Sequence, residues 1–393
     1  MSGLDTPMMG AMGYWKRAIS ERLLAGSAEL TYRLLGGRSG QRDFSRVVVV
    51  APLGRQNGVA SGARLQHAAL RQLGVDAELV DAAPALRNPL LRIPHHAGTA
   101  YVIHSGGPQA AALLATMLPL ATDAYRVAFW AWELPDPPLE WSGCDRHFAE
   151  IWTPSAFAKA SLARMMDRPI HVVPHRAPGR GRRIRNPDGC FTVLAMADTR
   201  SSLSRKNPHG ALRAFRTAFG RSSAVQLYLK LHGSQSELAQ FERANANLLR
   251  TGNIHLIRGY VDDTALAALY RRADVFLSLH RAEGFGLPMF EAMANGIPVV
   301  ATGWSGNTEF MSNSDSELVP YTLVRVNDQS AVYMGSMWAE PDIDAASCAL
   351  RRLADNLHHY ENLSAAAHRR IASLAPEFPF AVPEGKCRGD GHA

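Results

Sequence analysis

The segment SLHRAEGFGLPMFEAMANGIPVVATGWSGNTE, residues 278–309, decides the fold of this chain of 393 residues. The apolar stretch ADVFLSL that leads into it predicts a buried strand. Gly284 and Gly286 permit a sharp turn, and Pro288 suits the first turn of a helix that we expect to end near Asn295. A second apolar strand, IPVVAT, follows the helix. The order of strand, turn, helix and strand predicts a unit that handles a nucleotide.

The start of this helix has the chemistry of an anion site. Backbone N–H groups of Phe285, Gly286 and Leu287 would point out of the helix N-terminus, where the helix dipole favours negative charge. Glu283 precedes the turn. Glu291 lies eight positions after Glu283, about one turn into the helix. An acid near a helix N-terminus is often only a partner of the dipole. The glycines, the proline and the flanking strands around the two acids favour a functional role for them.

A second polar loop, DTRSSLSRKNPHG, covers residues 198–210. A predicted strand ends at Asp198, and a helix is expected to begin after Pro208. Between them lie Arg200, Arg205 and Lys206. Cations above a helix N-terminus suit a diphosphate, because opposite charge and exposed N–H groups reinforce each other. A solvated basic turn is the alternative.

The two segments together resemble the Glu-x7-Glu motif and the S-x-x-x-R-K-N-P loop of retaining glycosyltransferases with a GT-B fold. These belong to the family 4 type, also called glycosyl transferases group 1, and the likeness is to a bacterial polysaccharide-assembling branch. The resemblance implies that Glu283 lies beside the donor sugar and that Glu291 hydrogen-bonds the ribose of the nucleotide. It also implies that Lys206 and Arg200 neutralise the donor diphosphate, with Arg205 as a substitute. Glu283, Lys206 and Arg200 are therefore the candidate catalytic residues.

Further donor-binding candidates follow from the same resemblance. The nucleotide base commonly meets the backbone near the segment HLIRGYVDD, which makes Arg258 and Tyr260 candidates. A role in capping the turn is the alternative for both residues. Ser305, Gly306 and Asn307 are expected to line the sugar side of the cleft.

The acceptor side is less well defined by the sequence. Gly58 lies in the loop LGRQNGVASG, which lacks the G-x-G-x-x-G pattern of a dinucleotide site and is expected to close against a sugar or phosphate. Trp132 either grips a sugar ring or belongs to the core. Glu133 stands where many family members carry a histidine near the donor sugar, and Ser155 either caps the next helix or touches the acceptor. His104 ends the preceding strand, but a lone histidine is more often structural.

Strands alternate with helices through both halves of the chain, which predicts parallel, doubly wound sheets. The segments WAEPDIDAASCALRRLADNL and ENLSAAAHRRIASL predict two C-terminal helices. The resemblance implies the α/β GT-B architecture, in which two Rossmann-like domains face each other across a cleft and C-terminal helices cross back. The expected division is a leader over 1–45, an acceptor-side domain over 46–178, a basic hinge linker over 179–189, a nucleotide-sugar domain over 190–340, crossing helices over 341–380 and a disordered tail over 381–393.

Two basic segments leave alternatives open. Residues 12–35 could form an amphipathic helix that rests on anionic lipid, a helix that packs on the catalytic body, or a loosely ordered leader. The linker RAPGRGRRIRNPD carries five arginines that are either solvated or directed at lipid phosphates.

The composition narrows the classes of partner. A net charge of +7 and a pI near 9.4 favour an anionic partner, but no nucleic-acid-binding motif is present. The four cysteines are far apart and predict reduced, structural thiols. The sequence has no apolar run of membrane-spanning length and no secretory segment near its start. We therefore expect a cytoplasmic protein, with peripheral contact on the inner face of the plasma membrane left open.

The expected function is that of a retaining hexosyltransferase. It would move mannose or glucose from a GDP-mannose or UDP-glucose type of donor to a saccharide acceptor in bacterial exopolysaccharide, capsule or lipopolysaccharide synthesis. The acceptor could be linked to polyprenol diphosphate. No cofactor is expected, and we predict metal independence. A nucleotide-sugar epimerase of the GT-B fold, a glycan phosphorylase and a non-catalytic sugar-binding homologue are the alternatives.

Overall fold

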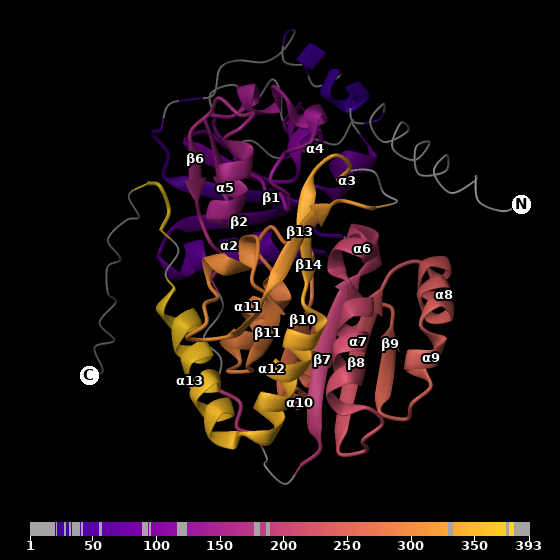
Figure 1. Ribbon diagram of the computed structural model, residues 1–393. Coiled ribbons are helices and arrows are strands. Elements are labelled where there is room, and N and C mark those ends of the chain that lie inside the picture. The colour runs from indigo at the N-terminus through magenta and orange to yellow at the C-terminus, as the bar shows by residue number, and fades with distance from the viewer. Residues whose placement is uncertain are drawn as a thin grey trace, which may run out of the picture. The chain divides into compact units, whose positions relative to one another are not determined.

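The chain forms two compact units, which are described separately (Figure 1). The computed structural model describes residues 42–380 except 55–56, 89–92, 94–95, 116–123, 177–180, 186–188, 329–332 and 375–376, together with residues 20, 22–26, 29–30, 33 and 40. Among these, the N-terminal unit holds residues up to 132, 136–176 and 377–380. The C-terminal unit holds 133–135 and 181–374. The expected N-terminal helix lies mostly outside the described residues.

The N-terminal unit is built on a parallel sheet with the strand order β2-β1-β3-β4-β5-β6 among its described residues. Its strands are β1 (Arg46–Ala51), β2 (Asp76–Asp81), β3 (Thr99–His104), β4 (Tyr125–Phe129), β5 (Glu150–Thr153) and β6 (Ile170–Val172). Its helices are α2 (Gly58–Gln72), α3 (Ala83–Arg87), α4 (Gly107–Ala115), η1 (Leu139–Trp141), η2 (Cys144–His147) and α5 (Ala156–Leu162). Val47 and Val49 of β1 pack with Leu70 of α2 in the core.

The C-terminal unit repeats the pattern with the parallel order β12-β11-β10-β7-β8-β9 among its described residues. Its strands are β7 (Phe191–Asp198), β8 (Val225–His232), β9 (Ile254–Arg258), β10 (Val275–Ser278), β11 (Val299–Thr302), β12 (Glu317–Val319), β13 (Tyr321–Arg325) and β14 (Met337–Pro341). Its helices are η3 (Thr199–Ser201), α6 (Leu203–Lys206), α7 (Pro208–Phe219), α8 (Gln235–Ala244), α9 (Ala246–Leu249), α10 (Asp263–Arg272), α11 (Leu287–Ala294), η4 (Gly306–Glu309), α12 (Ile343–Asp355) and α13 (Leu357–Ser373).

Helices cover both faces of this second sheet. Val193 and Ala195 of β7 belong to the apolar cluster that includes buried residues of α7, α8 and α12. Leu194, between them, belongs to the cluster formed with α10, α11 and α13. Successive strand residues point to opposite faces, so a strand that is buried on both sides must be apolar throughout. This architecture confirms the predicted fold class of two parallel-sheet α/β domains.

The hairpin β13–β14 was not predicted from the sequence. It is antiparallel and pairs Tyr321 with Pro341 at one end and Arg325 with Met337 at the other. The sequence analysis placed the segment WAEP inside a helix, but this segment forms β14, and α12 begins only at Ile343 with Asp342 as its N-cap. The side chain of Asp342 accepts hydrogen bonds from the first amides of α12, which fixes the start of the helix there.

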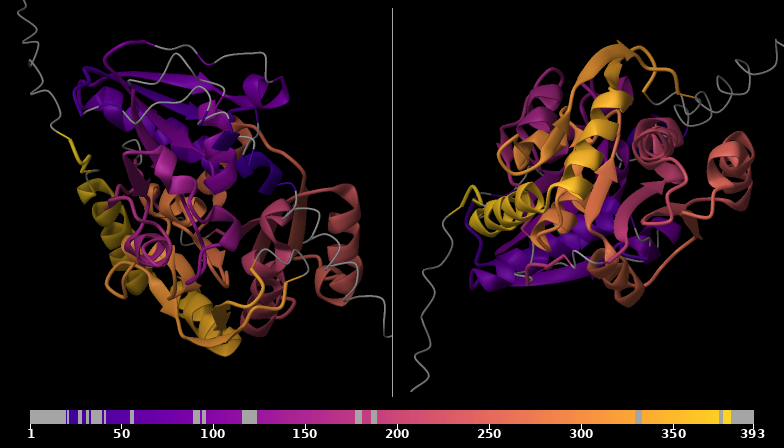
Figure 2. Two further views of the ribbon diagram at one scale, coloured as in Figure 1. Left: turned by 90° about the horizontal axis from the view of Figure 1, so that it is seen from above. Right: turned by 60° about the horizontal axis from the view of Figure 1, so that its bottom comes forward.

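The C-terminal helices group with the C-terminal unit, and the crossing of helices between the units stays a prediction. Helix α12 packs on α7, and α13 packs on α11, so both belong to the C-terminal unit (Figures 1 and 2). The short segment 377–380 is the described part of this region that joins the N-terminal unit. There the rings of Phe378 and Phe380 lie 5.7 and 5.9 Å from the ring of Trp152. Within the described residues, the segment 377–380 joins the N-terminal unit through these two aromatic side chains.

Two linker arginines are neither solvated nor directed at lipid. Arg183 forms an ion pair with Asp274 at 2.6 Å and donates to the carbonyl oxygen of Arg271 at 2.7 Å. Arg185 donates to the carbonyl oxygens of Leu353 and Ala354 at the end of α12. These bonds satisfy carbonyls that a helix end leaves open, and they attach the linker to the C-terminal unit.

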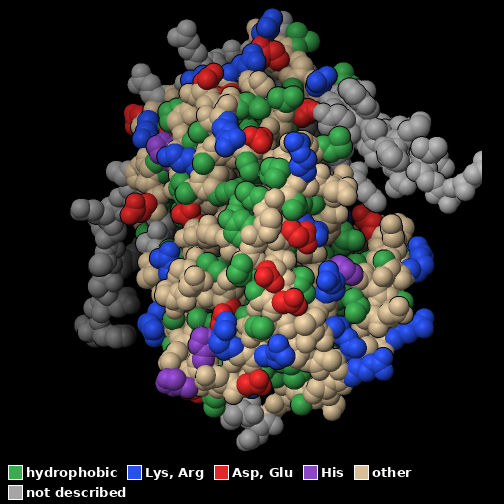
Figure 3. Space-filling view, in the orientation of Figure 1, with side chains coloured by type: hydrophobic (Ala, Val, Ile, Leu, Met, Phe, Trp, Pro, Cys, Tyr) green, Lys and Arg blue, Asp and Glu red, His purple; other side chains and the backbone are tan. Residues whose placement is uncertain are grey.

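Surface charge is unevenly spread over the visible face. Lys and Arg side chains gather over α8 and α9, whereas charges of both signs mix over the middle of the face (Figure 3). Within the part of the chain that the structure describes, no helix is long and apolar enough to cross a membrane.

Candidate active site

Two turns of the C-terminal unit lock the backbone of Glu283. The N–H of Glu283 donates to Oγ of Ser305 at 2.8 Å, and its carbonyl oxygen accepts from the N–H of Gly306 at 2.8 Å. A Cβ atom at Gly306 would lie 2.1 Å from the carbonyl oxygen of Gly284, so only glycine fits. The turn after β11 therefore holds the turn after β10, as parallel neighbours allow.

The carboxylate of Glu283 is buried between two cations. Its Oε1 lies 2.5 Å from Nζ of Lys206, and its Oε2 lies 3.5 Å from Nη1 of Arg205. Burial raises the pKa of Glu283, but the positive charges of Lys206 and Arg205 outweigh burial and bring the pKa down to about 2. Glu283 is therefore an ionised carboxylate at neutral pH and cannot serve there as a general acid.

Lys206 is presented by a very short helix with capped ends. Helix α6 is a single turn that begins after Ser202, whose hydroxyl accepts from the N–H of Arg205 at 3.0 Å. It ends at Asn207, which has a left-handed backbone with φ of 49°. The side chain of Asn207 donates to the carbonyl oxygen of Leu279 at 2.8 Å and accepts from the N–H of Gly210 at 3.0 Å. One residue thus ends α6, starts α7 and attaches both helices to the loop after β10.

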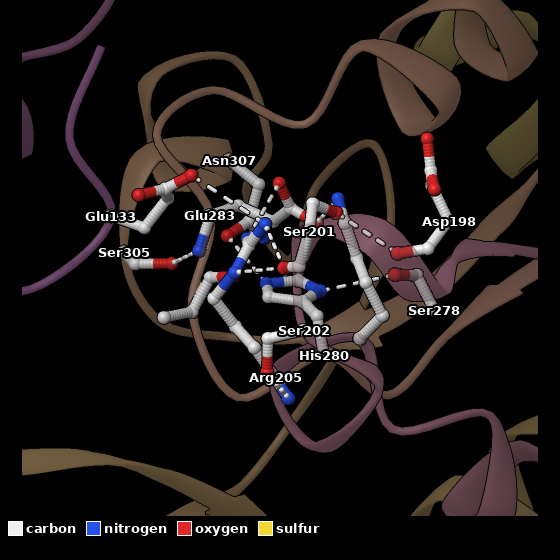
Figure 4. Close-up of polar contacts among 12 residues, drawn as sticks. Glu133, Asp198, Ser201, Ser202, Arg205, Ser278, His280, Glu283, Ser305 and Asn307 are labelled. Atoms are coloured by element: carbon white, nitrogen blue, oxygen red, sulfur yellow. Dashed lines mark hydrogen bonds and ion pairs between the residues drawn. The ribbon is translucent and has the colours of Figure 1, made fainter. Parts of the chain in front are cut away.

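Arg205 has a structural task that the sequence analysis did not foresee. Its guanidinium is buried and donates to the carbonyl oxygen of Ala282 at 2.7 Å and to that of Ser201 at 3.0 and 3.2 Å (Figure 4). It therefore ties the α6 turn to the loop that carries Glu283. The role of Arg205 as a substitute ligand for the diphosphate stays a prediction beside this bracing role.

The sequence analysis missed His280, which lies at the centre of the site. Its ring is buried between the hydroxyl of Ser278, 3.1 Å from Nδ1, and Oδ1 of Asn307, 3.0 Å from Nε2 (Figure 4). Burial lowers the pKa of His280 and favours the neutral ring. Asn307 also donates to the carbonyl oxygen of Thr302 at 3.0 Å, so its buried amide braces the turn from within. His280 lies two positions after the end of the buried strand β10 and three before Glu283, and this position was the sequence signal that could have indicated it.

The structure places Arg200 in a different group. Its Nη2 lies 2.7 Å from Oδ2 of Asp198 and 3.1 Å from Nδ1 of His232, at the carboxyl ends of β7 and β8. The side chain of Arg200 is 42% exposed, and that of Asp198 is 26% exposed. Arg200 is therefore held by an acid of its own strand end, whereas Lys206 is held by Glu283.

Helix α11 begins as predicted. Gly286 is its N-cap, with φ of +99°, and no side chain caps the helix start. Leu287 is its first residue, and the ring of Phe285 is buried 4.8 Å from the ring of Phe310. The side chain of Phe285 thus belongs to the core. Glu291, on the same helix, accepts a hydrogen bond from the hydroxyl of Tyr270 at 2.9 Å.

The remaining donor-side candidates lie on the surface. Arg258 forms a two-point ion pair with Glu242, at 2.6 and 2.8 Å, and is exposed. Tyr260, on the loop after β9, is 51% exposed. The contact of Arg258 and Tyr260 with a nucleotide base stays a prediction.

The acceptor-side candidates of the N-terminal unit have local roles. Gly58 is the first residue of α2, so the segment predicted as loop already belongs to the helix. Trp132 is buried, and its Nε1 donates to the carbonyl oxygen of Asp136 at 2.8 Å. Oγ of Ser155 accepts from the N–H of Ala158 at 3.2 Å, which is the capping alternative.

Glu133 and His104 each have a partner within their own unit. Glu133 groups with the C-terminal unit, with its Oε1 3.5 Å from Nη2 of Arg205. His104 is buried, bonded to Gln66 and stacked on Phe129 at 4.2 Å. Among the described residues, no group of three or more His, Cys, Asp or Glu side chains is arranged to hold a metal ion. Metal independence stays a prediction.

Comparisons with known proteins agree with this geometry. Residues 200–369, which contain both acids and the α6 turn, match the model of the family glycosyl transferases group 1. A stretch of 100 residues is 34% identical to the lipopolysaccharide core biosynthesis mannosyltransferase LpsB of Rhizobium meliloti. This stretch covers 24% of the chain and 28% of that relative, so the match spans much less than the whole relative.

Solved structures extend the likeness to both units. HepE of Anabaena, in complex with UDP and glucose, superposes with a TM-score of 0.60 at 12% identity, over 84% of this chain and 96% of that one. A mutant of S. aureus TarM, in complex with fondaparinux, α-GlcNAc-glycerol and UDP, gives a TM-score of 0.52 at 12% identity. That match covers 71% of this chain and about half of TarM, 52%. Residues 200–369 thus resemble the glycosyl transferases group 1, and the two parallel-sheet units share the GT-B fold of these solved structures.

Proposed function

We propose that this protein is a glycosyltransferase that moves a hexose from a nucleoside-diphosphate sugar to a saccharide acceptor and retains the anomeric configuration. One observation carries the proposal. Glu283 pairs with Lys206 and lies three positions before Gly286, the N-cap of α11, within the segment that matches the glycosyltransferase family model. A cation, an ionised acid and the N-terminus of a helix in one loop cluster suit a diphosphate sugar.

The site offers stabilisation where charge develops. Departure of a nucleoside diphosphate leaves negative charge on its terminal phosphate, and the ammonium of Lys206 with the backbone N–H groups at Gly286 would stabilise it. Glu283 is ionised, since the cations hold its pKa at about 2. Its negative charge would stabilise the positive charge that forms on the sugar ring in an oxocarbenium-like transition state. Glu283 therefore has an electrostatic role in this proposal and no role in proton donation.

Retention is proposed through a front-face displacement. The acceptor hydroxyl oxygen bonds to the anomeric carbon on the side from which the phosphate oxygen departs, and that phosphate oxygen takes the hydroxyl proton. The products are the glycoside and the nucleoside diphosphate. The two acids support this route, because Glu283 pairs with Lys206 while Glu291 bonds to Tyr270, so they do not act as a matched pair on one carbon.

The relatives suggest which substrates to test first. LpsB is a mannosyltransferase of lipopolysaccharide core biosynthesis, and HepE was solved with UDP and glucose. We therefore place GDP-mannose first and UDP-glucose second, with acceptors from bacterial surface polysaccharides, including polyprenol-diphosphate-linked saccharides. Contact with an anionic membrane surface stays a prediction, since the leader that would make it lies outside the described residues.

A donor panel tests the proposal. The protein is incubated with GDP-mannose, UDP-glucose and related donors, with and without saccharide acceptors, and the products are analysed by mass and by the anomeric signals in NMR. We expect an acceptor enlarged by one hexose, with the α-linkage of the donor retained. A free epimerised sugar from the donor alone would show the epimerase instead. Donor binding without any turnover would show a sugar-binding homologue, and an inverted linkage would overturn the retaining mechanism.

A further inference from the structure

Arg281 joins three segments through its backbone. Its N–H donates to the carbonyl oxygen of Arg205 at 2.7 Å, and its own carbonyl oxygen accepts from the N–H of Ala339 at 3.0 Å. Arg281 therefore lies between the α6 turn and strand β14, two residues before Glu283 in the chain. A shift of either neighbour would be transmitted to the loop that carries the acid.

The side chain of Arg281 also connects the α6 turn with strand β14. Its Nη1 donates to the carbonyl oxygen of Ser204 in α6 at 2.5 Å. Its Nε and Nη2 donate to the carboxylate of Glu340 on β14 at 2.6 and 3.0 Å, and the guanidinium lies 5.4 Å from the ring centre of Trp338. Such a fork is the strong, geometrically defined form of an Arg–carboxylate pair. One guanidinium thus holds α6 on one side and the hairpin on the other.

The loop end of the hairpin contacts the same turn. The hydroxyl of Ser202, at the start of α6, donates to the carboxylate of Asp328. The ring of Tyr333 lies 5.7 Å from the guanidinium of Arg205, and Figure 1 shows the hairpin rising beside α6. The hairpin loop therefore contacts the α6 turn directly, through Asp328 and Tyr333, whereas Glu340 and Trp338 of β14 reach it through Arg281.

Neither partner in this contact is stable by itself. A helix of one turn does not persist in water, because its nucleation is unfavourable and its terminal carbonyls are left open. An isolated two-stranded hairpin is also marginal. The order of both elements must come from their contacts, and Arg281 supplies donors to the carbonyls of Ser204 and Arg205 as well as to the hairpin.

We propose that Arg281 is a positioning residue: it clamps the α6 turn against the β13–β14 hairpin and so keeps the ammonium of Lys206 on Glu283. Its importance for turnover rests on the proposed function, whereas the clamp itself does not. Displacement of a catalytic cation by about 1 Å can reduce a rate by about 10²-fold. Loss of the clamp should therefore weaken transition-state stabilisation more than it weakens binding of the free nucleotide.

The experiment compares Arg281→Gln with a matched control. Arg352 and Glu317 form a two-point pair at 2.6 and 3.0 Å in the same unit, which is the geometry of Arg281 with Glu340, but Arg352 lies on α12 and pairs with β12. Arg352→Gln thus removes an equal pair at another place. Hydrogen exchange is followed at the N–H groups of Lys206 and Asn207, which donate within the α6 turn.

We expect exchange at these two amides to be about tenfold faster or more in Arg281→Gln and unchanged in Arg352→Gln. With the best donor, kcat of Arg281→Gln should fall about 10- to 100-fold while its affinity for GDP and UDP changes about threefold or less. Arg281→Lys, which keeps the charge without the fork, should recover part of kcat. Should Arg281→Gln not fold, Glu340→Gln leaves the arginine in place and should raise the same exchange rates.

Equal exchange in α6 for wild type, Arg281→Gln and Glu340→Gln would overturn the clamp, whatever the activity. Equal loss of kcat in Arg352→Gln would also overturn it, because the effect would then be one of general stability. If the wild type turns over no donor, the proposed function fails, but the exchange comparison still decides whether Arg281 holds the turn.

Discussion

Two carboxylate–cation pairs stand at the carboxyl ends of neighbouring strands in the C-terminal unit, and they differ in burial. Glu283 follows β10 and its side chain is 10% exposed, whereas Lys206 lies on α6 and its side chain is 17% exposed. Asp198 and Arg200 end β7, with side chains 26% and 42% exposed. An exposed pair contributes little, because water screens it, whereas a buried pair is strongly coupled. Two loops with similar charge patterns can therefore contain ion pairs that interact with very different strength.

The largest expected effect comes from neutralising the buried acid. In Glu283→Gln, kcat should fall about 10²- to 10³-fold, because the charge that stabilises the sugar cation is lost. Binding of GDP or UDP should stay within a few-fold of wild type, since Lys206 and α11 remain. Steady-state kinetics and calorimetry measure the two quantities. Asp198→Asn is the matched variant, with an expected loss below tenfold, and equal losses in both variants would erase the distinction between the pairs.

The buried pair should also make stability sensitive to acid. The pKa of Glu283 is about 2 in the folded protein and lies at an ordinary value near 4.5 in the unfolded chain. Its ionised form therefore stabilises the fold above about pH 4.5, and this stabilisation is lost as the pH falls towards 2, by at most about 3 kcal/mol. Chemical unfolding of wild type and Glu283→Gln across this window measures it. The variant should lose less stability on acidification, and parallel curves for the two proteins would contradict the assigned ionisation.

A smaller effect is expected from the exposed pair. Arg200→Ala should raise KM for the donor about 3- to 10-fold and leave kcat nearly unchanged, because Arg200 must leave Asp198 to reach a diphosphate. The dependence of KM on salt should become weaker in the variant. A loss of kcat as large as that of Glu283→Gln would mean that Arg200 acts in the transition state.

The smallest effect is expected at Arg258. This side chain is exposed and already pairs with Glu242, so Arg258→Ala should change donor KM and kcat by about twofold or less. Kinetics with the same donor measure this, and Glu242→Ala serves as the partner variant. A tenfold loss of donor affinity in Arg258→Ala alone would instead support the predicted contact between Arg258 and the nucleotide base.

Much of the fold and the core of the site could be predicted, because local rules and tertiary structure agree there. Gly286 has the positive φ that the predicted turn requires, and α11 covers Leu287–Ala294 close to the predicted bounds. Lys206 and Glu283, 77 positions apart, meet because parallel strands bring their carboxyl ends to one edge of the sheet.

The rest depends on side-chain burial, which the sequence does not reveal. Arg205 and Lys206 are adjacent cations, yet only the structure shows that Arg205 points into backbone carbonyls while Lys206 points to Glu283. Asn307 and His280 are polar residues whose bonding partners are distant in sequence. The hairpin was missed because WAEP precedes a strong helix without an intervening glycine, so the helical pattern was extended backwards over β14.

The most direct test of the central claim is calorimetric titration of GDP and UDP into wild type, Lys206→Ala and Arg258→Ala. The account predicts saturable binding of at least one nucleotide to the wild type, about tenfold or more weaker binding to Lys206→Ala, and unchanged binding to Arg258→Ala. Equal affinity of wild type and Lys206→Ala would contradict the claim that the buried Lys206–Glu283 pair forms the wall of a diphosphate-sugar site.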